Sequence, residues 1–154
     1  MQSLPITPMT GDHIEPVLAI ERSSFSRPWG RLAFFSELAC AHSRNYVLSG
    51  APLPDVNEQG IVAYTSMRVI IDEIHLLKIA VAPACRRLGI AYRFLRDSLN
   101  LTAHQDIKSA FLEVRSSNTA GLCLYRKLGF ETIGNRPGYY PDSGEAAIIM
   151  KKTF

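Results

Sequence analysis

The segment 79–91, with the sequence IAVAPACRRLGIA, combines the features of an anion-binding site. An apolar run ends at Pro83, and a turn that contains glycine then opens a predicted helix. The start of a helix presents unpaired backbone N–H groups and the positive end of the helix dipole, so it favours an anion. Arg86 and Arg87 add positive charge, and Gly89 allows a ligand to approach the backbone closely. The segment therefore predicts a site for a phosphate-bearing ligand.

The pattern R-x-x-G-x-A, at residues 86–91, has low specificity when it is considered alone. It arises by chance in about one chain in seven of this length, and a helix start with two solvated arginines would also satisfy it. A preceding strand and a following helix give it the context that phosphate-binding loops require. It is not a Walker loop, because no Gly-Lys-Ser/Thr follows, and it lacks the three-glycine spacing of a dinucleotide fingerprint.

One acidic residue, Glu113, interrupts an otherwise apolar predicted strand between Leu112 and Val114. In one interpretation it pairs with Arg115, which lies two residues further on and on the same face of the strand. In the other it is a general base for an amine. An α-amino group with a pKa of about 8 is largely protonated at pH 7 and must lose a proton before it attacks.

Composition restricts the class of the protein more than its function. The chain has 154 residues, of which 47% are hydrophobic and 20% charged, so we expect a single globular domain over residues 1–154. The net charge is +3 and the basic residues are scattered, so we expect no direct nucleic-acid partner. Three cysteines form no C-x-x-C pair, four histidines lie singly, and no apolar run reaches about 18 residues. We therefore expect a cytoplasmic protein without a disulfide framework, a metal or membrane contact.

Hydrophobic periodicity and turn residues divide the chain into strands and helices. The predicted strands are 3–7, 45–49, 61–69, 73–81, 109–115, 130–134 and 146–151, and the predicted helices are 12–23, 31–41, 87–103 and 119–128. The connection 51–60 is long and Pro-rich, and is expected to be a mobile loop. This order predicts an α/β (α+β) fold with a central mixed, mostly antiparallel sheet flanked by helices. The strands before and after the helix 87–103 should be parallel neighbours.

Several motifs, in order and with consistent spacing, resemble the GCN5-related N-acetyltransferases, the GNAT family. Residues 86–91 resemble that family's coenzyme A pyrophosphate loop, Q/R-x-x-G-x-G/A. The other similar segments are 112–118, 124–130, 139–141 and 147–150, so the likeness covers about 14–150. Within the family the motifs are most similar to the bacterial RimI type, which acetylates the N-terminal alanine of a small-subunit ribosomal protein. The resemblance implies a single-domain GNAT fold and acetyl-CoA as cofactor.

The resemblance also implies which residues bind the cofactor. Backbone groups of 79–81 would pair with the pantetheine arm, whose amides mimic a strand, although these residues also fit a plain core strand. A backbone N–H of the same strand would polarise the thioester carbonyl. The amides of 87–92 would bind the pyrophosphate, and Asn118 would contact the cofactor besides capping the helix that follows it. The complete cofactor-binding set is Ile79, Ala80, Val81, Arg86, Arg87, Leu88, Gly89, Ile90, Ala91, Tyr92 and Asn118.

Catalytic and acceptor-binding roles follow from the same resemblance. Glu113 would be the general base, and Tyr125 would protonate the departing coenzyme A thiolate rather than serve only as a packed aromatic. A phenol has a pKa of about 10 and a thiol of about 8.5, so positioning would have to make this transfer effective. The expected walls for the acceptor, which could also be plain packing residues, are Phe25, Trp29, Tyr139 and Tyr140.

Two departures from the family pattern bear on the acceptor. Ala146 stands where the family's Gly-Glu-Asp-Ala has an acid, and Lys78 replaces a small polar residue before Ile-Ala-Val. The expected reaction is acetyl transfer by direct attack, in a ternary complex, on the N-terminal α-amine of a protein. The expected partner is a ribosomal protein with a small first residue, and the expected state is a monomer or weak dimer. The alternatives are an acetyltransferase for a small amine, such as a polyamine or aminoglycoside, and a non-catalytic acetyl-CoA-binding module.

Overall fold

The structure is a computed structural model that describes residues 3–50, 57 and 59–154. Its strands form one sheet in the order β1-β2-β3-β4-β5-β7-β6. They are β1 (Ile6–Pro8), β2 (Ser43–Ser49), β3 (Ile61–Ile70), β4 (Glu73–Val81), β5 (Ser109–Arg115), β6 (Glu131–Arg136) and β7 (Ala147–Thr153). The α-helices are α1 (Ile14–Ser24), α2 (Arg31–Ala39), α3 (Ile90–Thr102) and α4 (Thr119–Lys127). Two short 3-10 helices, Gly11–His13 and Pro83–Cys85, precede α1 and α3.

The sheet is mixed and mostly antiparallel, which confirms the predicted fold class. Every neighbouring pair is antiparallel except β4 and β5, the strands that flank α3 along the chain. The predicted helix 87–103 was wrong at its start, because Arg87 and Gly89 have φ angles of +65° and +74° and α3 begins only at Ile90. The predicted strand 3–7 is confined to Ile6–Pro8. Most of the predicted mobile loop 51–60 lies outside the described residues.

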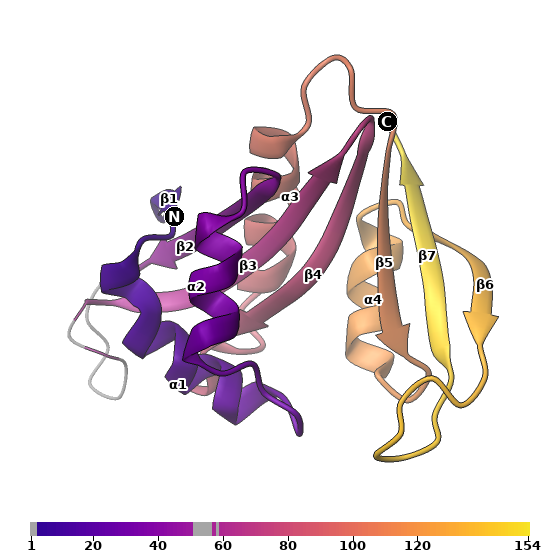
Figure 1. Cartoon of the computed structure of the whole chain (residues 1–154), viewed down its shortest axis with the longest axis horizontal. Coiled ribbons are helices and arrows are strands. Elements are labelled where there is room, and N and C mark those ends of the chain that lie inside the picture. Colours follow the sequence, from indigo (N-terminus) through magenta and orange to yellow (C-terminus); the bar gives the residue numbers. More distant parts are fainter. Residues whose placement is uncertain (1–2, 51–56, 58) are drawn as a thin grey trace.

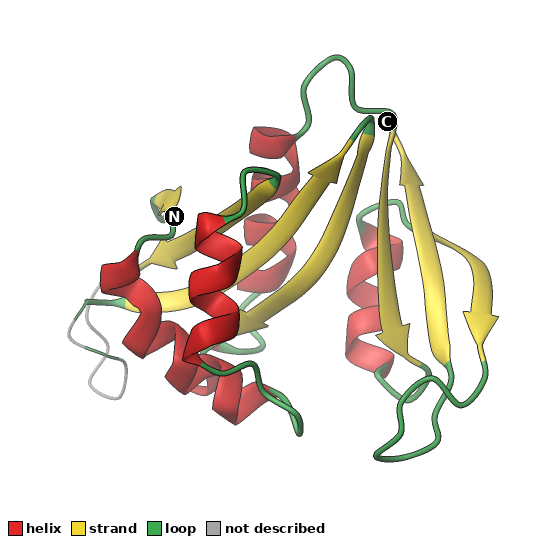
Figure 2. Cartoon of the chain, viewed as in Figure 1, coloured by secondary structure: helices red, strands yellow, loops and turns green. Residues whose placement is uncertain are grey.

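Helices cover the two faces of the sheet unequally (Figure 1). One core cluster joins α1 and α2 to β3 through residues such as Leu18, Phe34 and Tyr64, all almost fully buried. A second cluster lies on the α3 and α4 side and includes Leu99 and Met150. Figure 2 shows α1 and α2 in front of the first half of the sheet only, so the same face of β5, β7 and β6 carries loops instead of helices. That asymmetry leaves room for a site in front of β5.

The strands β4 and β5 separate soon after they pair, as Figure 1 shows. Only Glu73–His75 and Ser109–Phe111 are in register, and beyond them the two strands diverge. In β4 a bulge accompanies the divergence: Lys78 pairs with Ser66 and Leu76 with Met67, so Leu77 has no partner in β3. Bulges bend and twist a strand locally. The edge of β4 that faces β5 is therefore free of ladder partners from Leu76 onward.

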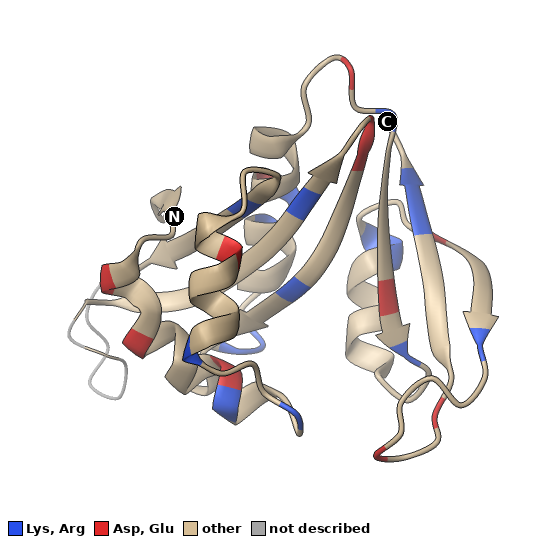
Figure 3. Cartoon of the chain, in the orientation of Figure 1, with Lys and Arg blue, Asp and Glu red and all other residues tan. Residues whose placement is uncertain are grey.

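The charges of the molecule are dispersed. Figure 3 shows Lys and Arg on helices and strands of both halves, without a continuous basic stripe in that view. No helix in the described part of the chain is long and apolar enough to cross a membrane.

Candidate active site

A cleft of about 1270 Å³ lies where β4 and β5 separate. Most of its wall comes from four parts of the chain: the α1–α2 loop, β4, β5 with α4, and the β6–β7 loop. Predicted site residues from all four meet in it, namely Phe25, Trp29, Ile79, Glu113, Asn118, Tyr125, Tyr139 and Tyr140. The cleft thus gathers side chains that are spread over more than a hundred residues of sequence.

Glu113 projects from β5 at the edge of this cleft. Its neighbours Leu112 and Val114 are buried on the opposite face, and its own side chain is 32% exposed. The interpretation in which Glu113 pairs with Arg115 is wrong, because its ion-pair partner is Arg136 of β6, with Oε1 and Nη1 3.4 Å apart. The carboxylate also lies beside Tyr139 and raises the pKa of that phenol. Glu113 is therefore a partly solvated carboxylate, and it can accept a proton from a group in the cleft.

Tyr125 reaches the cleft from α4 and is buried instead of solvent-exposed. Only 9% of the residue is accessible, and its ring packs edge-on against Phe130 with the centroids 6.0 Å apart. Burial disfavours the charged phenolate and raises the pKa of Tyr125 to about 12, with a further contribution from Tyr140. The hydroxyl therefore keeps its proton throughout the neutral range, as a proton donor must.

The start of α3 has the backbone geometry of an anion site. Arg87 and Gly89 both adopt left-handed conformations, and Gly89, the N-cap residue, has no side chain that could cap the N–H groups of the first turn. A Cβ on Gly89 would meet no heavy atom within 4 Å, so the space above the turn is open. This turn lies beyond the cleft lining, on the continuation of β4 into α3. The Arg86 side chain turns back instead, and its Nε and Nη2 donate to the Val81 carbonyl (3.0 Å) and the Ser24 hydroxyl (2.9 Å).

The chain matches the Acetyltransferase (GNAT) family over residues 14–130. It belongs to the GNAT family. A [ribosomal protein bS18]-alanine N-acetyltransferase of Escherichia coli strain K12 is 32% identical over 133 residues, which are 85% of this chain and 84% of that protein. The crystal structure of the E. coli ribosomal-protein-S18-alanine N-acetyltransferase has a TM-score of 0.80 and 28% identity over 98% of this chain and 94% of that one. The structure of Arabidopsis thaliana NAA60 with a bisubstrate analogue has a TM-score of 0.87 at 13% identity, with 98% of both chains covered, and shows the shared fold alone.

Members of the GNAT family with this fold are acetyl-CoA-dependent N-acetyltransferases, and this chain is one of them. Its residues fit the cofactor. From Leu76 onward the β4 edge towards β5 has no ladder partner and can pair with the amides of an extended arm. The open turn at Gly89 follows β4 after the short 3-10 helix Pro83–Cys85 and suits a pyrophosphate.

Asn118 is the N-cap of α4, as predicted, because its Oδ1 accepts a 2.9 Å hydrogen bond from the Gly121 N–H. It also lines the cleft. Its contact with the cofactor stays a prediction.

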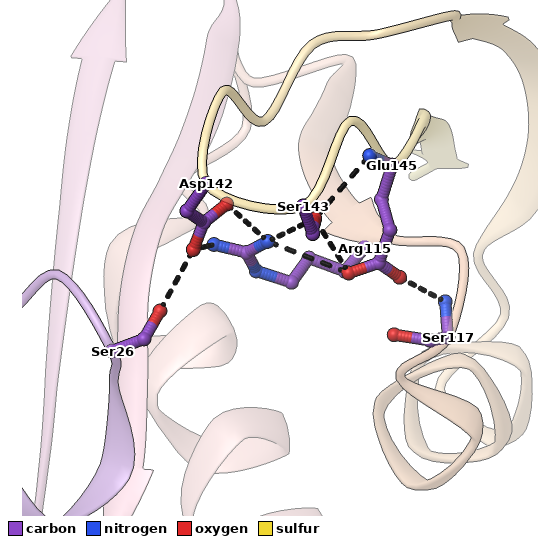
Figure 4. Close-up of polar contacts among 6 residues, drawn as sticks. All are labelled: Ser26, Arg115, Ser117, Asp142, Ser143 and Glu145. Atoms are coloured by element: carbon purple, nitrogen blue, oxygen red, sulfur yellow. Dashed lines mark hydrogen bonds and ion pairs between the residues drawn. The ribbon is translucent and has the colours of Figure 1, made fainter.

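At the end of the cleft formed by the β6–β7 loop, a polar network that sequence reasoning missed holds this loop in place (Figure 4). Arg115 forms two parallel hydrogen bonds to the Asp142 carboxylate, of 2.9 and 2.8 Å, and its guanidinium lies 4.0 Å from the ring centre of Tyr140. Hydrogen bonding from Arg115 lowers the pKa of Asp142 to about 2. Asp142 also accepts a 3.0 Å bond from Ser26, which joins this loop to the α1–α2 loop across the cleft.

The same network includes the acid beside Ala146. Glu145, one residue earlier, accepts a hydrogen bond from the Ser117 N–H (3.1 Å) and lies 3.5 Å from Arg115. Hydrogen bonds from Ser117 and Ser143 lower the pKa of its carboxyl group. Glu145 thus holds the end of β5 to the loop, and the alanine at position 146 has no structural explanation. The sequence shows an acid, Glu145, next to Ala146, but it does not show that Arg115 and Ser117 are the partners of this acid.

Proposed function

We propose that this GNAT enzyme acetylates the N-terminal α-amine of a protein, and that its acceptor is a ribosomal protein with a small first residue, Ala or Ser. One observation carries the proposal: a carboxylate, a buried phenol and two aromatic loops meet in one cleft beside the free edge of β4. The E. coli relative, which is named for acetylation of a ribosomal-protein alanine, supports the choice of acceptor. The continuous sheet from β1 to β6 supports a single domain.

Each group in the cleft has a distinct part in this proposal. Bound acetyl-CoA supplies a thioester whose carbonyl carbon is open to attack by an amine. Glu113, directly or through a water molecule, takes the proton that the ammonium group must lose. Tyr125 holds its proton at Oη and donates it to the departing thiolate. A backbone N–H at the free edge of β4 donates to the carbonyl oxygen as negative charge develops there.

The chemistry of the base favours an α-amine over a lysine side chain. Their pKa values are about 8 and 10.4, so removal of the lysine proton costs about 3 kcal/mol more at the same pH. A partly solvated carboxylate such as Glu113 is a weak base, and this difference therefore acts directly on the rate.

The shape of the acceptor side favours a small first residue. Tyr139 and Tyr140 pack edge-on with their centroids 5.0 Å apart, and Ser26 and Asp142 link the two loops by a hydrogen bond. The two tyrosine rings and the Ser26–Asp142 hydrogen bond leave little room for a large side chain. An extended N-terminus can approach end-on between the loops, whereas a lysine in the middle of a folded surface cannot.

A peptide panel tests the proposal. Peptides that vary at positions one to three, each with a free and a blocked N-terminus, are incubated with acetyl-CoA, and the acetylated atom is located by mass spectrometry. We expect α-acetylation of free Ala- and Ser-initiated peptides and no reaction of blocked ones. Glu113→Gln should lower turnover most at low pH, where more of the amine is protonated. Acetylation of blocked peptides on lysine, or a preference for spermidine over every peptide, would refute the acceptor assignment.

A further inference from the structure

Glu21 is a fully buried carboxylate that accepts hydrogen bonds from three parts of the chain: the α1–α2 loop, β3 and β4. It lies on α1 and has no exposed surface. Its Oε1 accepts hydrogen bonds from the Lys78 ammonium group of β4 (2.8 Å) and from the backbone N–H of Trp29 (2.9 Å). Its Oε2 accepts a hydrogen bond from the Tyr64 hydroxyl of β3. Glu21 thus fixes the α1–α2 loop against β3 and β4.

Lys78 lies on β4 and lines the cleft opposite the α1–α2 loop residues Phe25 and Trp29. It follows the bulged Leu77 in β4, lines the cleft and is only 14% exposed. Its Nζ lies 3.7 Å from the ring centre of Phe25 and 5.3 Å from that of Trp29. Two aromatic faces and a carboxylate are the surroundings in which proteins bind organic cations. Here the cation belongs to the protein itself.

We propose that Phe25, Trp29 and Glu21 form an ammonium cage whose resident occupant is Lys78, and that this occupancy makes Lys78 a specificity-determining residue. While its own ammonium lies over the rings of Phe25 and Trp29, a second cation at these rings would be repelled by a like charge. A cationic first side chain and a polyamine are therefore excluded from this end of the cleft, whereas a small uncharged first residue is not. The exclusion of acceptors rests on the proposed function, but the occupancy of the cage does not.

Removal of the occupant should convert the cage into a binding site. Lys78→Ala deletes the three outer carbons and the nitrogen, which together correspond to n-propylammonium. Glu21 is then left buried without its cation, which is unfavourable unless an external cation replaces it. n-Propylammonium should bind in the vacated space, and the uncharged 1-propanol should not.

Trp29 provides a readout that needs neither acceptor nor activity, because it is the only tryptophan of the chain. Its emission should change in Lys78→Ala and should return towards the wild-type spectrum, with saturation, as n-propylammonium is added. The wild-type spectrum should not respond to the same additions. The matched control is Lys108→Ala, which breaks the exposed Lys108–Asp72 pair (3.6 Å) away from the cleft and should leave Trp29 emission unchanged.

A double variant guards against loss of folding and tests the carboxylate. Glu21→Gln with Lys78→Ala removes both charges and keeps the vacated space, and the amide oxygen that replaces the carboxylate can still accept from the Trp29 N–H. This variant should fold and should not respond to n-propylammonium. A response equal to that of Lys78→Ala would show that Glu21 is not part of the cage.

The acceptor profile completes the test. The ratio of kcat/KM for Lys-initiated to Ala-initiated peptides should rise at least tenfold in Lys78→Ala, while coenzyme A affinity stays within twofold of the wild type. Wild-type protein that acetylates no peptide would refute the proposed function and leave the fluorescence result to decide the cage. A Lys78→Ala spectrum that ignores n-propylammonium, or an unchanged peptide ratio in an active variant, would overturn the inference about Lys78.

Discussion

A substitution at Gly89 tests whether this glycine only permits a turn or also leaves room for the cofactor. It precedes α3 with a φ of +74°, and a Cβ there would meet no heavy atom of the free protein within 4 Å. Gly89→Asp should therefore cost the fold only about 1 kcal/mol, the strain of a left-handed residue. In the complex it places a negative charge beside the pyrophosphate. At roughly 5 Å and an effective dielectric constant of about 20, each phosphate charge contributes about 3 kcal/mol of repulsion.

Coenzyme A affinity should therefore fall by about 100-fold or more in Gly89→Asp, as measured by titration calorimetry. Gly138→Asp is the matched control, because Gly138 has a φ of +65° and is equally free of neighbours. It should lose a similar amount of stability in urea unfolding and keep its coenzyme A affinity. Wild-type affinity in Gly89→Asp would refute the assignment of the pyrophosphate to this turn.

Three further predictions follow from single residues. Tyr125→Phe should lower kcat about 10²- to 10⁴-fold without weakening coenzyme A binding, and full activity would make Tyr125 a packing residue. Because the pKa of Asp142 is lowered from 3.8 to about 2, its pairing with Arg115 should stabilise the fold fully above about pH 4 and progressively less as the pH falls towards 2. An Asp142→Asn variant with the wild-type acid unfolding profile would contradict this. Ile71→Gly should stabilise the fold by about 1 kcal/mol in urea unfolding, since Ile71 is 91% exposed with a φ of +58°, and a lower midpoint would refute strain at this turn.

The fold was largely predictable because its signals are local. Alternating strands, turn residues and helix caps each depend on a few consecutive residues, and the one parallel pair follows from the helix between its strands. The predicted start of α3 at residue 87 was three residues too early, because the backbone is left-handed at Arg87 and Gly89. The sequence predicted that Gly89 lies in a turn, but only the conformation reveals that Arg87 belongs to the same turn.

The side-chain pairings of the site were not predictable, because they join distant parts of the chain. Spacing along β5 suggested a Glu113–Arg115 pair. In the structure Arg115 instead forms an ion pair with Asp142 of the β6–β7 loop, and Glu113 forms one with Arg136 of β6. The contact of Glu21 with Lys78 spans 57 residues and gave no pattern in the sequence. Residues that belong to a sequence motif, such as Glu113, could be predicted. Residues that support the site through distant contacts, such as Asp142 and Glu21, could not.

The most direct test of the account is the identity of the acetylated atom in a natural acceptor mixture. Purified enzyme, acetyl-CoA labelled with ¹³C in the acetyl group and unacetylated ribosomal proteins are combined, and the products are mapped by mass spectrometry. We predict heavy acetyl groups on the N-terminal α-amine of a protein that begins with Ala or Ser, with about a 100-fold or greater loss of label in Tyr125→Phe. Label confined to lysine side chains or small amines, or equal labelling by Tyr125→Phe, would contradict the central claim.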